Sequence, residues 1–297
     1  MYLYTPFPER RTPRYLAPGW DTALFGCPLT DYVGIAQLLW SSALECAGRF
    51  DPSFLDTPDG KQICQVIDRH TILGTLEQHF AIDVPTFRAT ELKTKEDLAK
   101  KRHGLDAALL RRFTFNPLAG RPAVLGFDSW LLCPAPQYIW RKASPMGIYY
   151  SGKDHFGTGF PEETGFLFEE YIGRNLRLLR DADVVPEISY RVGRDTRQGV
   201  DWIVVFEDLV LLVEVKSTMP TEPVRLGIAG GLDHIARKIG RAYTQINTTA
   251  GLIARRHPDF AAIPADRPCQ GLVVTLEPFH IANADLPVPK KSSSGSP

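Results

Sequence analysis

The fold is decided by the stretch Leu209-Val210-Leu211-Leu212-Val213-Glu214-Val215-Lys216. Six of its eight residues are aliphatic and do not alternate with polar residues, which predicts a strand that is buried on both faces. Glu214 and Lys216 are two residues apart, so their side chains point to the same face of that strand. Burying a carboxylate and an ammonium group costs several kcal/mol per ion unless partners compensate. Such a cost is typical of a functional site.

A second strand precedes this one and is expected to run antiparallel to it. The dipeptide Glu207-Asp208 separates two apolar runs and predicts a tight hairpin turn. A turn at that dipeptide places Asp201 opposite Glu214, with about 5 Å between their β-carbons. Two carboxylates that close repel each other unless a cation lies between them, and a hard divalent ion such as Mg²⁺ suits oxygen ligands. Lys216 is then placed to orient a water molecule or to stabilise charge on a phosphate.

The short pattern [D/E]-x-K also occurs by chance. The chain carries it at 59–61 and at 91–93, and neither copy lies in an apolar strand. Taken singly, Asp201 fits a turn residue, and Glu214 with Lys216 fits the exposed end of a strand. The combination of hairpin, register and apolar surroundings favours the functional interpretation.

The segments around this hairpin predict the order α-β-β-β-α-β, which makes the fold class α/β. Hydrophobic periodicity and turn residues indicate a helix at 163–180, strands at 184–192, 200–206 and 209–217, a helix at 233–256 and a strand at 271–276.

A little over a third of the chain resembles the PD-(D/E)XK, or restriction-endonuclease-like, nuclease superfamily. The motif stands here as Val200-Asp201, twelve intervening residues and Glu214-Val215-Lys216, with Val200 in place of the usual proline. The resemblance implies a restriction-endonuclease-like core that hydrolyses phosphodiester bonds. It also implies that Asp201, Glu214 and the carbonyl of Val215 hold Mg²⁺ or Mn²⁺, while Lys216 positions the attacking water.

Many members of that superfamily add a Glu from the first helix, and two candidates occur here. Glu169 shares a mostly apolar helical stripe with Phe166, so it is expected to point inward. Glu170 shares a charged outer face with Glu163 and Arg174. The resemblance therefore makes Glu169 the further metal ligand or catalytic acid. The alternative for Glu169 is a carboxylate near the helix start that the helix dipole favours.

The helix predicted at 233–256 carries a polar stripe beside its apolar face. By resemblance, Gln245 and Lys238 lie near the scissile phosphate, and Lys238 and Arg241 bind nucleic acid. Residues 225–256 contain six Lys or Arg and one acidic residue, which suits contact with a phosphate backbone. The alternative is an ordinary solvated helix face.

The rest of the chain carries no catalytic motif. We expect residues 1–150 to form a mainly helical region, 151–286 to form the nuclease-like domain and 287–297, which are rich in Pro, Lys, Ser and Gly, to form a disordered tail. Within the first region we expect an irregular arm at 1–29, helices that start near residues 30, 71 and 94, further helix at 105–113 and a strand-like segment at 122–150. This region fits a specificity domain, a dock for a protein partner or an inhibitory cover.

Composition narrows the classes of function. The 34 Lys and Arg residues balance the 34 Asp and Glu residues, so a nucleic-acid partner has to meet a local basic surface. The five cysteines form no C-x-x-C pair and no secretory signal is evident, which predicts reduced thiols in a cytoplasmic protein. No apolar run approaches the roughly 20 residues of a membrane span.

The predicted function is therefore a Mg²⁺-dependent nuclease, either endonuclease or exonuclease, with DNA favoured over RNA as substrate. We expect it to act in a phage-defence or DNA-repair system, as a monomer or as an oligomer. One alternative is a catalytically silent nucleic-acid-binding module of a larger complex. Another is a different metal-dependent hydrolase that uses the same carboxylates.

Overall fold

The computed structural model describes residues 1–9, 11–101, 116–127, 129–217, 219 and 231–276. The helix expected at 105–113 and the disordered tail expected at 287–297 lie outside the described residues. Among the helices that the structure describes, none combines the length and the apolar character needed to cross a membrane.

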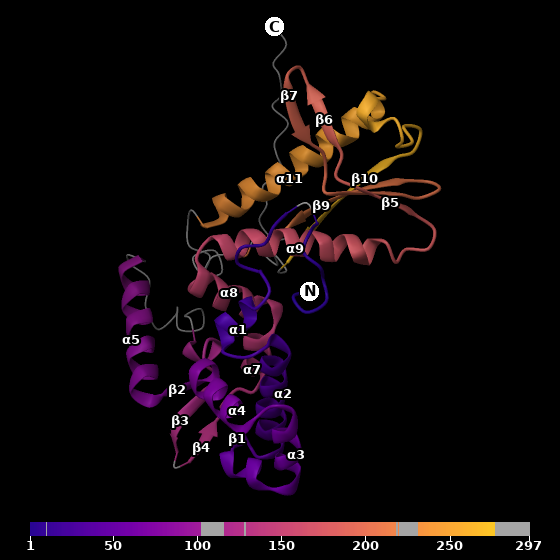
Figure 1. The fold of residues 1–297 in the computed structure, drawn as a ribbon. Coiled ribbons are helices and arrows are strands. Elements are labelled where there is room, and N and C mark those ends of the chain that lie inside the picture. Colours follow the sequence, from indigo (N-terminus) through magenta and orange to yellow (C-terminus); the bar gives the residue numbers. More distant parts are fainter. Residues whose placement is uncertain (10, 102–115, 128, 218, 220–230, 277–297) are drawn as a thin grey trace. The chain divides into compact units, whose positions relative to one another are not determined.

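The chain divides into two compact units, Met1–Leu167 and Phe168–Pro297 (Figure 1). The division falls inside the helix α9 (Gly159–Leu176), further along the chain than the limit expected at residue 150.

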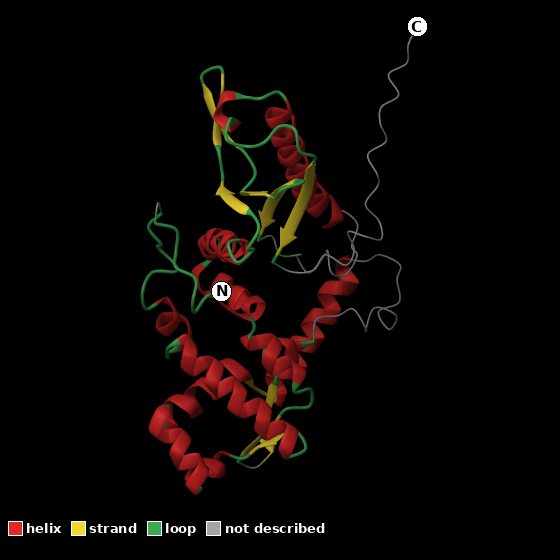
Figure 2. Cartoon of the chain, turned by 90° about the vertical axis from the view of Figure 1, so that its right-hand side faces the viewer, coloured by secondary structure: helices red, strands yellow, loops and turns green. Residues whose placement is uncertain are grey.

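Helices dominate unit 1, as expected, but a four-stranded sheet was not predicted (Figure 2). The sheet has the order β1-β4-β3-β2. The elements are α1 Trp20–Phe25, α2 Leu29–Glu45, β1 Arg49–Phe50, η1 Pro52–Asp56, α3 Pro58–Val66, α4 Arg69–Thr75, η2 Leu76–Phe80, β2 Ala81–Asp83, α5 Val84–Lys101, η4 Pro117–Ala119, β3 Ala123–Phe127, β4 Trp130–Leu132, α7 Gln137–Ala143, α8 Pro145–Phe156 and the first turns of α9.

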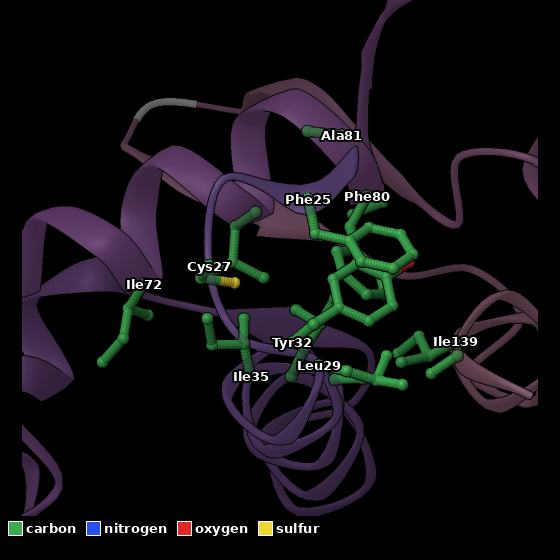
Figure 3. Close-up of a cluster of buried hydrophobic side chains, with 14 of the residues drawn as sticks. Phe25, Cys27, Leu29, Tyr32, Ile35, Ile72, Phe80, Ala81 and Ile139 are labelled. Atoms are coloured by element: carbon green, nitrogen blue, oxygen red, sulfur yellow. The ribbon is translucent and has the colours of Figure 1, made fainter. Parts of the chain in front are cut away.

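The aromatic core of unit 1 joins helices that are distant in sequence. The ring centroids of Phe25 and Tyr32 lie 3.9 Å apart, and those of Tyr32 and Phe80 lie 5.1 Å apart. Figure 3 shows these rings with Ile35 on one side and Ile139 of α7 on the other. Burial of each such side chain contributes about 1.5–3 kcal/mol, so this cluster holds α1, α2 and α7 together.

Two helix starts in unit 1 differ from the sequence-based expectation. The prediction of strand-like structure at 122–150 was wrong from residue 137 onward, where α7 and α8 form. The Ser144 hydroxyl accepts the N–H of Gly147 at 3.3 Å, and Pro145 occupies the first position of α8, where a missing N–H does no harm. The helix expected from Thr94 begins at Val84 instead, because the carboxylate of Asp83 accepts the N–H of Thr86 at 2.7 Å.

The amino-terminal arm packs more closely than its composition suggests. Glu163, on the first turns of α9, is buried, and its carboxylate accepts the backbone N–H groups of Arg14 at 2.7 Å, Tyr15 at 2.9 Å and Leu16 at 2.8 Å. The expectation that Glu163 lies on the charged outer face of its helix was therefore wrong. A carboxylate with three N–H donors can be buried at low cost. These three hydrogen bonds tie the start of α9 to residues 14–16, so this part of the helix belongs to unit 1.

The second half of α9 and the rest of unit 2 follow the expected α-β-β-β-α-β order, except that the first expected strand is divided into two and an additional strand, β7, follows it. After α9 follow β5 Asp183–Pro186, β6 Ser189–Val192, β7 Asp195–Gln198, β8 Trp202–Val205, β9 Val210–Lys216, α11 Gly231–Ala254, η5 Pro258–Phe260 and β10 Cys269–Thr275. The strand expected at 184–192 is interrupted, because its second half turns away and pairs with β7. The fold therefore belongs to the predicted α/β class.

The four-stranded sheet of unit 2 has the order β10-β9-β8-β5, in which only β10 runs parallel to its neighbour β9. The hairpin register predicted from the sequence is confirmed, because Trp202 pairs with Val213 and Val205 with Val210. Leu212 and Val213 are fully buried, although they face opposite sides of the strand. The strand β9 is therefore covered on both faces, as its run of aliphatic residues without alternation predicts.

Candidate metal and catalytic site

Asp201 and Glu214 meet at one end of the β8–β9 hairpin. Asp201 immediately precedes β8, and the next step of the register beyond the Trp202–Val213 pair places it opposite Glu214. The Asp201 carboxylate accepts the backbone N–H of Val215 at 2.6 Å. The backbone N–H of Asp201 in turn acts to lower the pKa of the Glu214 carboxylate. The Asp201 carboxylate is thus fixed by the backbone of β9.

Lys216 completes this group from the same face of β9. Its ammonium group donates to one oxygen of the Glu214 carboxylate, Oε1. The other oxygen, Oε2, is buried and has no hydrogen-bond partner among the described residues. Buried oxygens without partners are rare in folded proteins and often mark the place of an ion or a water molecule.

Burial and mutual repulsion dominate the electrostatics of the two carboxylates. Burial raises the pKa of Glu214 to about 7, and the charge of Asp201 acts in the same direction, although Lys216 partly opposes both effects. Burial also raises the pKa of Asp201, against the N–H of Val215 and the charge of Lys216. One ammonium group therefore does not balance this site, and further positive charge would stabilise both carboxylates in their ionised form.

The raised pKa of Glu214 predicts how the stability of the metal-free protein depends on pH. The folded protein keeps the Glu214 proton up to pH about 7, whereas the unfolded chain releases it near the ordinary glutamate pKa of 4.5. The free energy of unfolding should therefore fall as the pH rises through this window. Glu214→Gln should remove that part of the pH dependence, which urea unfolding in EDTA between pH 4.5 and 8 would measure. Glu207→Gln, at the exposed hairpin turn, is the control, and equal pH profiles for all three proteins would contradict the assignment.

The chemistry of this donor set fits a hard cation with few protein ligands. Asp201 and Glu214 supply carboxylate oxygens, one of which is buried without a partner. Among the described residues, no three His, Cys, Asp or Glu side chains gather closely enough to hold a metal ion together. The structure thus does not bring Glu169 into one ligand cluster with the two carboxylates. Mg²⁺ usually keeps several waters and takes only one or two protein carboxylates, so a pair suffices.

Helix α9 lies directly against the start of β8. The indole N–H of Trp202 donates to the backbone carbonyl of Glu169 at 3.1 Å. A β-carbon added at Gly173 would lie 2.1 Å from the Trp202 ring, so the helix backbone itself touches that ring. The turn of α9 that carries Glu169 and Glu170 is therefore anchored to Trp202, the residue after Asp201, and both Glu side chains are half-buried. Their exposure does not distinguish them.

The helical phase of these two residues still predicts a difference in activity. If Asp201 and Glu214 hold a metal ion for cleavage, Glu169→Gln should lower the cleavage rate at least about tenfold, because it removes the charge that this phase directs inward, whereas Glu170→Gln should have little effect. Cleavage rates and thermal unfolding of both variants would measure this. Equal effects, or a larger effect at Glu170, would show that the phase assigned to the helix is wrong.

The polar stripe of α11 has two parts in the structure. The side-chain amide of Gln245 donates to the backbone carbonyl of Gly199, two residues before Asp201. Gln245 therefore fixes the backbone that leads into Asp201. Lys238 is half-buried, and its pKa is lowered by burial and by the positive charges of Lys216 and Arg241. Lys238 therefore lies close enough to Lys216 to feel its charge. Arg241 itself is exposed.

The sequence-based inference missed the residues that position this site. Gly173 of α9 packs against Trp202 of β8. The sequence did contain a signal for this contact, because Gly173 lies on the inner stripe of its helix and Trp202 is a large residue in the strand expected at 200–206. The contact between Gln245 and Gly199 joins residues 46 positions apart and leaves no local pattern. Comparisons of the chain with protein-family models, with curated proteins and with solved structures found no match.

Proposed function

We propose that this protein is a metal-dependent nuclease of the PD-(D/E)XK type, with a restriction-endonuclease-like core in unit 2. One observation carries the proposal. Glu214 is buried on a strand covered on both faces, one of its oxygens is held by Lys216, the other has no partner among the described residues, and Asp201 faces it across the hairpin. A contribution to stability does not explain this cluster of charged side chains, because a protein with apolar residues of similar volume in their place is often equally stable or more stable.

The residues present fit Mg²⁺ or Mn²⁺. Asp201 and Glu214 would hold the ion through carboxylate oxygens, with the carbonyl of Val215 as a further ligand and Glu169 as the additional acid that the resemblance implies. When bound, the ion supplies positive charge where negative charge develops on the scissile phosphate.

The other groups of the chain act by orientation. The N–H of Val215 fixes the rotamer of the Asp201 carboxylate. The ammonium group of Lys216 stands at the same edge and donates a hydrogen bond to the attacking water or to a phosphate oxygen. Gln245 fixes Gly199 and thereby the backbone that leads to Asp201. Lys238 and Arg241 add positive charge for the phosphate backbone of a nucleic acid.

A cleavage panel tests this proposal. The full chain is incubated with single-stranded and double-stranded DNA and RNA, each with Mg²⁺, Mn²⁺ or EDTA, and with a small phosphodiester as a separate substrate. We expect cleavage of DNA with Mg²⁺ or Mn²⁺ and none with EDTA. Hydrolysis of the small phosphodiester alone would instead support a different metal-dependent hydrolase.

One observation favours a second candidate function. The salt bridge between Lys216 and Glu214 neutralises part of the site without any metal, and a protein that keeps the fold only to bind nucleic acid would be stable in this form. Such a module would bind nucleic acid equally well in EDTA and would leave it intact under every condition of the panel. It would then serve a larger complex, with unit 1 as the dock for a protein partner.

A further inference from the structure

The hairpin formed by β6 and β7 belongs to unit 2 but not to the candidate site. It lies between β5 and β8 in sequence and forms a separate two-stranded sheet (Figure 1). Figure 2 shows it as a ribbon that extends away from the four-stranded sheet. Its strands have four residues each, which corresponds to a length of about 13 Å.

The base of this ribbon is firmly anchored. Tyr190 is 5% exposed, and its ring packs against those of His257 at 6.1 Å and Phe260 at 5.9 Å between centroids. The backbone N–H of Arg191 donates to the carboxylate of Asp259 at 3.1 Å. Because its base is anchored, the ribbon keeps a fixed direction, and its outer part can contact a partner without first becoming ordered.

The outer part of the ribbon is positively charged and, apart from Val192, which is 44% exposed, polar. Arg191, Arg194 and Arg197 are all exposed, and Asp195 is the one acidic residue among residues 189–198. Within the described part of the chain, none of the three guanidinium groups forms an ion pair. Exposed arginines without acidic partners contribute little to stability, so their charge is available for a partner.

The register of the ribbon gives its two faces different characters. Tyr190 pairs with Arg197 and lies on the anchored face. The opposite face consists entirely of polar side chains that can donate or accept hydrogen bonds, namely Ser189, Arg191, Thr196 and Gln198. Two of these four, Ser189 and Gln198, are already linked at 2.7 Å at the base of the ribbon.

The ribbon also lies close to the candidate site. Gln198 ends β7 three residues before Asp201, so the two α-carbons are within about 11 Å of each other. Gly199 between them is held on both sides, because its N–H donates to the carbonyl of Ile188 at 2.9 Å and its carbonyl accepts from Gln245. A nucleic acid whose phosphate lies at Asp201 and Glu214 therefore passes the base of the ribbon.

We propose that the β6–β7 ribbon contacts the major groove of B-form double-stranded DNA next to the cleaved bond, an inference that rests on the proposed nuclease function. That groove is about 12 Å wide and admits a two-stranded ribbon, whereas the major groove of A-form RNA is too narrow and deep for side chains to read. The polar face with Arg191 meets base edges, and Arg194 and Arg197 meet phosphates. The substrate class is therefore duplex DNA rather than single strands or duplex RNA.

The test measures binding and leaves catalysis aside. A triple variant, Arg191→Ala with Arg194→Ala and Arg197→Ala, is made in an Asp201→Asn background. Its affinity for a DNA duplex of about 30 base pairs is measured in Ca²⁺ between 50 and 200 mM salt. We expect at least a tenfold loss of affinity, and a plot of log affinity against log salt that is less steep by about 2 to 3. Affinity for duplex RNA of the same length should change less than twofold.

A second triple variant controls for the loss of net charge. Lys61, Arg88 and Arg141 are exposed residues of unit 1, and their replacement by Ala removes the same charge from the chain. Equal binding by ribbon variant and parent, or equal losses in both triple variants, would overturn the inference, as would equal losses for DNA and RNA duplexes.

Failure of this inference can be separated from failure of the proposed function. If the wild type cuts duplex DNA while the ribbon variant binds it normally, the ribbon inference alone is wrong. If the wild type never cuts but the ribbon variant loses duplex binding, the nuclease proposal is wrong and the ribbon remains a DNA-binding surface.

Discussion

Asp201→Asn is expected to reduce metal-dependent cleavage by roughly a thousandfold or more while the protein stays folded. Asn keeps the volume of Asp and one oxygen that can accept the N–H of Val215, so the hairpin remains in register. The variant loses the negative charge that, with Glu214, would hold the cation of the proposed site. Burial already raises the pKa of Asp201, so a neutral side chain at this position should not lower the stability of the metal-free protein.

The matched control for Asp201→Asn is Asp208→Asn in the same hairpin. Asp208 is exposed at the turn between β8 and β9, at the opposite end of the strands from the site. Initial cleavage rates with saturating Mg²⁺ and thermal unfolding curves are compared for wild type and both variants. Cleavage by folded Asp201→Asn at the rate of Asp208→Asn would eliminate the enzyme hypothesis.

Lys216→Ala is expected to lower turnover by about a hundredfold or more, with nucleic-acid affinity almost unchanged. An ammonium group at this place can hold water and phosphate in the transition state, or it can only neutralise Glu214 when metal is absent. The first role predicts the loss of turnover. The second predicts a less stable metal-free protein whose folded molecules still cleave normally. The surrounding apolar strand favours the first role, because an apolar residue would remove the cost of a buried charge more simply.

Three measurements on wild type and Lys216→Ala distinguish these roles. Cleavage rate in saturating Mg²⁺ reports turnover, binding in Ca²⁺ reports affinity, and thermal unfolding in EDTA reports the contact between Lys216 and Glu214. Lys216→Met, which keeps most of the side-chain volume, separates lost charge from lost packing. Near-normal cleavage by well-folded Lys216→Ala would refute the catalytic role.

The sequence predicts the β8–β9 hairpin well because local signals determine it. A two-residue polar turn between two apolar runs allows essentially one register, and that register is the one in the structure. The meeting of Asp201, Glu214 and Lys216 follows directly from it. Burial on both faces likewise follows from a run of aliphatic residues without alternation.

The features that the sequence did not predict depend on turn chemistry or on distant contacts. The strand expected at 184–192 is split after Pro186, and this proline was a signal of the break. Gly193 follows β6 and adopts φ 61°, where glycine is favoured, so it was a signal of the turn between β6 and β7. The helices α7 and α8 were missed because the short apolar runs and prolines of residues 122–150 were interpreted as strand-like, whereas Pro145 occupies the first position of α8. The position of Glu169 relative to the site depends on the packing of Trp202, which periodicity does not encode.

The contact of Glu163 with the arm has a consequence for synthesis on the ribosome. The three N–H donors of residues 14–16 precede their acceptor by 147 to 149 positions. The beginning of the chain therefore emerges long before the carboxylate that holds it, and it stays without its partner while most of unit 1 is translated. Domains usually fold during translation as their last segments appear, so unit 1 should reach its final form only after α9 has left the exit tunnel. In the interval the aromatic side chains of the arm are accessible to chaperones.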